Sequence, residues 1–155
     1  MTMLSFPGRL FAAVLLAAPL AACQTLGGAV LVASTVTTEL TPEAATSIAG
    51  DMVGRFAEQV GPGNTTIMLT PDGSVFGQAL EASLKAWGYA MVTYQQTEGT
   101  VTVPLAYVVD AFEGSVLVRL STTTVDVTRM YELSAAGAEP VSPVSVMQRA
   151  SGGTS

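Results

Sequence analysis

A stripe of apolar residues with helical spacing is the first clear pattern after the amino-terminal part of the chain. One apolar residue recurs at every fourth position of this stripe: Ile48, Met52, Phe56 and Val60. Such spacing places the residues on one face of an α-helix. Thr41 is a suitable N-cap and Pro42 suits the first helical position. Gly61 followed by Pro62 would stop the helix, so the pattern predicts a helix over residues 42–60.

A second stripe of the same kind follows a short turn. Its apolar residues are Phe76, Leu80, Leu84 and Trp87. The stripe predicts a helix from Val75 to about Trp87. Asp72 or Ser74 would cap its start, and Gly88 would lie just past its end. Because Trp87 lies on the stripe, we expect its ring to pack in the core.

Segments rich in β-branched and apolar residues separate and follow the two helices. Residues 65–70 and 89–95 are each predicted as a strand. Apolar and polar residues then alternate along 101–109, 116–120 and 125–131. This alternation predicts three strands of an antiparallel meander.

These elements define an α+β domain over residues 41–133. Its predicted order is α-β-α-β-β-β, with two helices packed on one face of a small mixed sheet. From Ser134 onwards Ala, Gly, Pro and Ser dominate. Residues 134–155 are therefore expected to form a flexible tail.

The start of the chain shows a charge, an apolar run and small residues in succession. Arg9 supplies one positive charge, and residues 10–18 are apolar. Leu20-Ala21-Ala22 then leads directly to Cys23, the single cysteine. This order is typical of a secretory signal peptide, and a cysteine directly after Leu-Ala-Ala resembles the bacterial lipobox. We therefore expect residues 1–22 to be cleaved off and Cys23 to become the lipid-carrying first residue.

Other interpretations of Cys23 are weaker. A lone cysteine is usually a small buried hydrophobe, but residues 10–22 cannot be part of a core if they are removed. A transmembrane anchor is disfavoured because the apolar run is shorter than the roughly 20 residues of a spanning helix, and Pro19 interrupts it. An exported protein without lipid is the main alternative. The several acyl chains of a bacterial lipoprotein would make membrane attachment effectively permanent.

The residues after the lipid position bear on localisation. In lipoproteins generally, Asp after the lipidated cysteine favours retention in the inner membrane, so Gln24 favours the outer membrane of a Gram-negative host, facing the periplasm. Residues 23–40 would form the lipidated amino terminus and a linker. Within it, Ala29–Thr37 is apolar and β-branched. This segment either adds as a strand to a partner or packs on its own domain or near the lipid surface.

Composition excludes several functions. The formal net charge is −6, and the six Lys and Arg residues are scattered singly. Direct binding of nucleic acid is therefore not expected. Histidine is absent, which removes the usual zinc sites and the commonest general base. One cysteine allows no intramolecular disulfide. We expect no catalytic residues, no metal and no cofactor apart from the covalent lipid on Cys23.

Three pairs of side chains could in principle carry chemistry: Ser83 with Lys85, Asp72 with Ser74, and Asp110 with Glu113. Ser83 and Lys85 lie two positions apart on a predicted helix, so their side chains point in different directions. The second pair shares a helix start, where capping is the simpler explanation. The third pair lies near a turn, where solvated charges are the usual case.

Other features also have structural interpretations. Gly61-Pro62-Gly63 lacks the lysine and the following helix of a phosphate-binding loop. Trp87, Tyr89 and Tyr94 could line a ligand pocket, but core packing is the simpler interpretation for the tryptophan.

Several segments together resemble one known family. They are the lipobox 20–24, Phe76–Leu84, Trp87–Ala90, Pro104–Asp110, Val116–Ser121 and Ser142–Arg149. Their order and spacing resemble the conjugal transfer lipoproteins of the TrbH family, found in the transfer operons of plasmids and integrative elements. No single segment is diagnostic, because these are core and turn residues without chemistry.

The resemblance implies a component of the mating-pair-formation apparatus, a type IV secretion system that passes DNA between bacteria. The protein would sit at the outer membrane beside other subunits of the channel, without a small-molecule substrate. The family offers no catalytic residues to carry over, and only Cys23 transfers as a functional position. Ala29–Thr37 and Pro140–Arg149 are the candidate contact segments. An auxiliary lipoprotein of another envelope or transport system, or a periplasmic small-ligand binder, are the alternatives.

Overall fold

The computed structural model describes residues 33–63, 65–70, 72–93 and 101–150. The first predicted helix is present as α1, Pro42–Val60, with Pro42 at its amino-terminal end. The Thr41 hydroxyl accepts a hydrogen bond from the Ala44 N–H at 3.2 Å and caps the helix. At the other end, Gly61 leaves the helix with φ of 84°, which glycine adopts without strain. The sequence therefore placed both ends of this helix correctly.

The second helix is α2, Val75–Ala86. Of the two predicted caps, Ser74 occupies the N-cap position, and its hydroxyl accepts a hydrogen bond from the Gly77 N–H at 2.9 Å. Gly88 has φ of 90° and turns the chain into the next strand, as predicted for this glycine.

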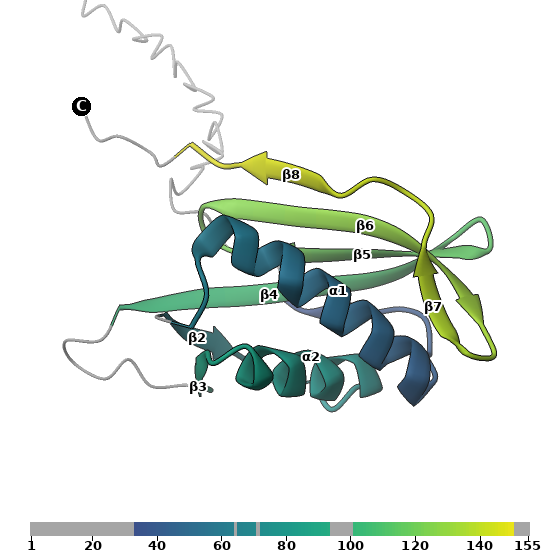
Figure 1. The fold of residues 1–155 in the computed structure, drawn as a ribbon, viewed down its shortest axis with the longest axis horizontal. Helices are drawn as coiled ribbons and strands as arrows, with labels where there is room; N and C mark the ends of the chain where they lie inside the picture. The colour runs from purple at the N-terminus through teal and green to yellow at the C-terminus, as the bar shows by residue number, and fades with distance from the viewer. Residues whose placement is uncertain (1–32, 64, 71, 94–100, 151–155) are drawn as a thin grey trace, which may run out of the picture.

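The strands form a mixed sheet, and both helices lie on one of its faces (Figure 1). The strands are β1 Thr35–Val36, β2 Thr66–Leu69, β3 Ala90–Val92, β4 Thr102–Phe112, β5 Ser115–Ser121, β6 Val125–Ser134, β7 Gly137–Pro140 and β8 Ser145–Gln148. The predicted fold class, α+β with two helices on one face of a mixed sheet, is confirmed. The predicted antiparallel meander is β4-β5-β6.

Strand β4 is long enough to pair with two strands along one edge. Residues Thr102–Leu105 pair with β2 in parallel, and Val108 and Val109 pair with β1 in parallel. The opposite edge of β4 pairs with β5, and β3 lies outside β2. The central strand thus joins a parallel half of the sheet to an antiparallel half.

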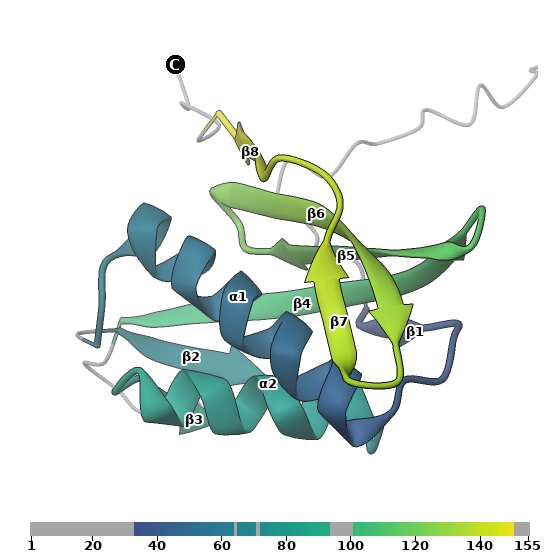
Figure 2. The ribbon, with the colours of Figure 1, turned by 45° about the vertical axis from the view of Figure 1, so that its right-hand side comes forward.

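Strand β6 repeats this arrangement near the carboxyl terminus. One edge pairs with β5, while the other pairs with β8 through residues 125–128 and with β7 through residues 131–134. Figure 2 shows β7 curling towards α1, whereas β8 continues the sheet at its border. Because β7 also packs against α1, the end of the chain is built into the domain.

The core lies between the helices and the sheet. The buried residues of helix α1 include Ile48, Met52 and Phe56 of the predicted stripe. The others lie beside the stripe: Ala44, Ala45, Ala49, Val53 and Ala57. Two aromatic pairs lie in this core. The ring centroids of Phe76 and Tyr107 are 5.3 Å apart, and those of Phe56 and Tyr89 are 6.0 Å apart. Such pairs add to the stabilisation from apolar burial.

Two predictions about the chain's course are wrong. The expected flexible tail 134–155 instead contains β7 and β8, held by ladders to β6. The predicted order α-β-α-β-β-β lacks β1, β7 and β8, and it omits one of β3 and β4, although both of these were expected individually. Strands β7 and β8 were missed because small residues and proline at 134–145 reduce hydrophobic alternation, while the free edge of β6 still offers hydrogen-bond partners to an extended chain.

The prediction for Trp87 is also wrong. We expected its ring in the core, but 46% of the residue is exposed. Trp87 is the C-cap residue of α2, and its ring lies against Gly54 of α1 at the surface. Gly88 then redirects the chain, and Tyr89, only 3% exposed, fills the core position instead.

Candidate functional site

The residue predicted to carry the lipid, Cys23, lies outside the described residues, as do the predicted signal peptide and Gln24. Ala33 is the first described residue, and β1 pairs with β4 of the same domain. The segment Ala29–Thr37 was expected either to add to a partner or to pack on its own domain. Its described part does the latter, with the Thr37 N–H donating to the Val109 carbonyl at 2.9 Å.

Asp72 and Ser74 form a capping cluster at the start of α2. The Asp72 carboxylate accepts hydrogen bonds from the Ser74 N–H at 2.9 Å and from the Ser74 hydroxyl at 2.6 Å. Burial alone would raise the pKa of Asp72, but hydrogen bonds led by that from Ser74 outweigh it and lower the pKa below its usual value. The two side chains therefore cap the helix, as the sequence indicated, rather than forming a reactive pair.

Tyr107 on β4 lies next to this cluster. Its hydroxyl is buried close to the Asp72 carboxylate, although its geometry falls short of a well-formed hydrogen bond. Burial and the carboxylate raise the pKa of the Tyr107 hydroxyl above its usual value. Gly77 permits this approach, because a Cβ at that position would overlap the hydroxyl and lie 2.7 Å from Asp72 Oδ1.

A surface depression of about 620 Å³ opens beside the capping cluster, between residues 36–40 and the start of α2. This depression bears on the alternative that the protein binds a small ligand. The polar side chains of Asp72 and Ser74 at this depression bond to each other instead of converging on its centre. Ligand pockets usually combine an apolar lining with a few convergent polar groups, so the depression gives that alternative little support.

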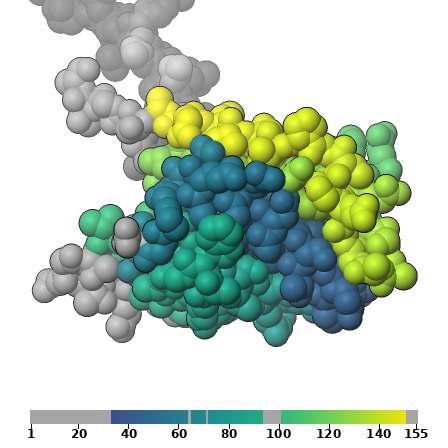
Figure 3. Space-filling model, viewed as in Figure 1, coloured from purple at the N-terminus to yellow at the C-terminus, as the bar shows by residue number. Residues whose placement is uncertain are grey.

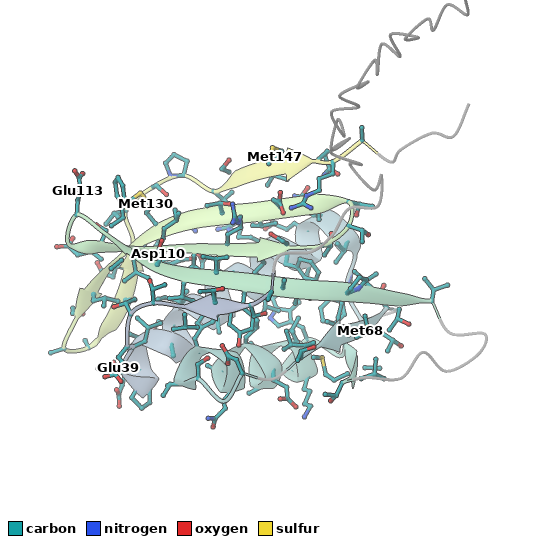
Figure 4. The ribbon with its side chains drawn as sticks, turned by 180° about the vertical axis from the view of Figure 1, so that it is seen from behind. Glu39, Met68, Asp110, Glu113, Met130 and Met147 are labelled. Atoms are coloured by element: carbon teal, nitrogen blue, oxygen red, sulfur yellow. The ribbon has the colours of Figure 1, made fainter. Side chains whose placement is uncertain are left out.

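The other predicted pairs are not brought together by a contact among the described residues. The Asp110 carboxylate accepts a hydrogen bond from the Thr37 hydroxyl, while Glu113 occupies the exposed turn between β4 and β5. Figure 4 shows the two acidic residues separated along this hairpin. The Lys85 ammonium pairs with Glu81, four residues earlier on the same helix, at 2.6 Å and not with Ser83.

The described ranges contain no group of three or more acidic, histidine or cysteine residues arranged to hold a metal ion. Within the same ranges, no helix combines the length and apolar character needed to cross a membrane.

Two ion-pair networks, which sequence reasoning did not find, attach the carboxyl-terminal strands. In the first, the Asp51 carboxylate on α1 accepts hydrogen bonds from Arg129 at 2.8 and 3.1 Å and from the Tyr131 hydroxyl at 2.6 Å. The Arg129 Nε donates to the Ser142 carbonyl at 2.9 Å, and the Ser142 hydroxyl accepts from the Met130 N–H. This network joins α1, β6 and the segment that leads to β8.

The second network fixes the end of β8. Arg149 makes a two-pronged contact with Asp126 on β6, with donor–acceptor distances of 3.0 and 2.7 Å. The Asp126 side chain is only 4% exposed, and that of Arg149 is 28% exposed. The Arg149 N–H also donates to the Thr124 carbonyl at 2.7 Å. In the alternation of β6, Asp126 falls on the polar positions together with Thr128, so the sequence pattern did not indicate that it is buried or that it has this partner.

These contacts place β8 as a ridge along one border of the molecule. Figure 3 shows this ridge, coloured yellow, above α1. All four residues of β8 are exposed. Among the described residues, β8 pairs with β6 and with no other strand, so its outer edge is open. This edge is the candidate functional site that the fold defines.

Comparisons with known proteins identify the class to which this domain belongs. The family model described as "Conjugal transfer protein TrbH" matches residues 26–150. A relative from Sinorhizobium fredii (strain NBRC 101917 / NGR234), described as "Probable conjugal transfer protein TrbH", is 47% identical over 135 residues. The match covers 84% of this chain and 90% of the relative. No solved structure gives a significant match.

The chain therefore belongs to the TrbH family of conjugal transfer proteins. The resemblance inferred from the sequence segments is confirmed, and the match includes β7 and β8.

Proposed function

We propose that this protein is an outer-membrane lipoprotein that serves as a non-enzymatic assembly component of a conjugative type IV secretion channel. Family membership over residues 26–150 is the observation that carries the proposal. It favours this function over an auxiliary role in another envelope or transport system. The arrangement of Arg9, the apolar run and Cys23 supports export and lipid attachment.

The proposed mechanism is positional. The lipid on Cys23 holds one end of the chain at the membrane, and the few residues between Cys23 and β1 in the sequence keep the domain close to it. Confinement raises the effective concentration of the domain near other envelope subunits, so that weak contacts become sufficient. Both candidate contact segments pair within their own sheet, Ala29–Thr37 through β1 and Pro140–Arg149 through β7 and β8. The second is favoured because all four residues of β8 are exposed.

Fractionation of donor cells tests the anchor. The Cys23→Ser variant is expected to leave the membrane fraction, whereas the wild-type protein sediments with the outer membrane. The Gln24→Asp variant is the matched control, because it keeps the lipid and changes only the sorting residue. It is expected to stay membrane-bound and move to the inner membrane. A Cys23→Ser protein that still sediments with the outer membrane would contradict the lipid anchor.

A further inference from the structure

We propose that a second copy of this chain docks on the helix-free face of the sheet, with Arg119 of each copy facing Asp110 of the other. The helix-free face is formed by the side chains of β4, β5 and β6 that point away from α1 and α2. This contact is a property of the fold and does not depend on the proposed function.

The strand register identifies the side chains of this face. Two neighbouring rows across β4, β5 and β6 form its centre: Asp110-Leu117-Met130 and Val108-Arg119-Thr128. Side chains alternate between the two faces of a strand, and the intervening Val109 and Val118 are fully buried on the helix side. Figure 4 looks onto the helix-free face, with Asp110 and Met130 labelled. Among the described residues, no helix covers this face.

Arg119 is the exception among the basic residues that the structure describes. Each of the others pairs with a carboxylate: Arg55, Lys85, Arg129 and Arg149. Within the described part of the chain, Arg119 has neither an ion pair nor a hydrogen bond, and its Nε is buried. Buried polar groups are nearly always hydrogen-bonded, and burying a charged donor without an acceptor is costly. An acceptor on another molecule would remove this cost.

Asp110 supplies a matching anion on the same face. Its carboxylate is exposed and accepts a hydrogen bond from the Thr37 hydroxyl, but it has no ion pair within the described ranges. Asp110 and Arg119 are diagonal neighbours on adjacent strands, because Asp110 lies opposite Leu117 and Arg119 lies opposite Val108. The face therefore carries one cation and one anion that are both unmatched, and such a surface is complementary to a second copy of itself.

A two-fold axis in the plane of the face can exchange Asp110 with Arg119. Neighbouring strands lie about 4.8 Å apart, and alternate residues of one strand lie about 6.7 Å apart. The axis then passes close to Val108 and Leu117, at about 55° to the strands. The strands of the two copies would cross about 20° from a right angle, near the orthogonal class of sheet packing. Two ion pairs would thus flank an apolar centre in which Val108 and Leu117 face their own counterparts.

The size of this face predicts a weak dimer. Strands β4, β5, β6 and β8 together are about 19 Å wide, and the ladder from Ala106 to Phe112 is about 23 Å long. Two such faces would bury about 900 Å² in total, at the low end of specific interfaces. Attachment of both copies to one membrane would strengthen the contact by raising their local concentration.

Cross-linking through an engineered cysteine tests the contact. The mature chain, residues 23–155, carries Cys23→Ser, so that an introduced thiol is the only one. Leu117→Cys places this thiol close to the proposed axis, where a short bis-maleimide should join two copies into a covalent dimer. Ala82→Cys, at an exposed position of α2, is the matched control and should not be joined.

Charge exchange tests the two ion pairs. In the Leu117→Cys chain, Asp110→Arg sets two cations against each other and should weaken dimerisation by at least about tenfold. Adding Arg119→Asp to Asp110→Arg should restore the dimer. Glu113→Arg makes the same charge change in the neighbouring exposed turn and should have no effect. Thermal unfolding checks that each variant is folded; if the double variant is not, the comparison of Asp110→Arg with Glu113→Arg decides.

Several results would overturn the proposal. They are no dimer through Leu117→Cys, equal dimer yields for Leu117→Cys and Ala82→Cys, equal losses for Asp110→Arg and Glu113→Arg, and a folded double variant that stays monomeric. In membranes of donor cells, cross-linking of Leu117→Cys to a different protein instead of to itself would also overturn it, in favour of another subunit. Because the purified chain carries no lipid, failure of the lipid anchor does not affect the first four results.

Discussion

The contact between Arg149 and Asp126 predicts how strongly the carboxyl-terminal strand is attached to the domain. The Arg149→Ala variant would leave the Asp126 carboxylate, 4% exposed, without its ionic partner. Breaking a buried ion pair from one side costs about 3–5 kcal/mol. Because the Arg149 side chain is 28% exposed, solvent screening reduces this, and we expect a loss of about 2–3 kcal/mol in the free energy of unfolding.

Urea denaturation measures this loss. Trp87 is the single tryptophan and lies against Gly54 of α1, so its fluorescence reports the unfolding of the helical layer. Lys85→Ala is the matched control, because its ammonium pairs with Glu81 on the exposed surface of α2. The control is expected to cost below about 1 kcal/mol. If Arg149→Ala costs no more than Lys85→Ala, then β8 is not part of the cooperative unit and the reasoning fails.

Two other substitutions test the core contacts. Tyr131→Phe removes the hydrogen bond to Asp51, and the free energy of unfolding should fall by about 1–2 kcal/mol at neutral pH. Burial and Asp51 raise the pKa of Tyr131 above its usual value of 10.0, so its contribution is present below pH 10 and is lost as the pH rises further. Above pH 10, the free energy of unfolding should therefore decline less steeply with pH for Tyr131→Phe than for the wild type, by up to about 1.4 kcal/mol per pH unit. Equal slopes of the two variants in denaturation measurements at several pH values would refute this. Gly77→Ala should lower the free energy of unfolding by about 1–3 kcal/mol, because its methyl group would overlap the Tyr107 hydroxyl. Gly50→Ala is the control and should be neutral or stabilising, because a methyl group there meets nothing within 4 Å. Thermal unfolding compares the two variants.

Local signals determined the parts of the fold that the sequence could predict. Caps and stripe residues such as Thr41 and Ser74 act within a few positions of the helix that they define, so the pattern located both helices. The alternation along β4, β5 and β6 likewise reflects which face of each strand is buried. These features depend on neighbours in the chain.

The features that the sequence missed depend on contacts between distant residues. Strand β8 contains little alternation, and it is fixed by the contact of Arg149 with Asp126 across the sheet. Asp51 and Arg129 are likewise far apart in the chain. Trp87 fits the helical stripe, but its ring lies against Gly54 of α1, a distant residue in the chain, and stays half exposed. The candidate edge was therefore visible only once the strands were paired.

Mating efficiency of donors that carry Cys23→Ser is the most direct test of the central claim, that a lipid-anchored domain assembles the transfer channel. The donors are compared with the deletion strain and with the same strain complemented by the wild-type protein, at matched protein levels. The account predicts that Cys23→Ser loses both membrane attachment and most of the transfer that the wild type restores. Normal transfer by a Cys23→Ser protein that has left the membrane would contradict it.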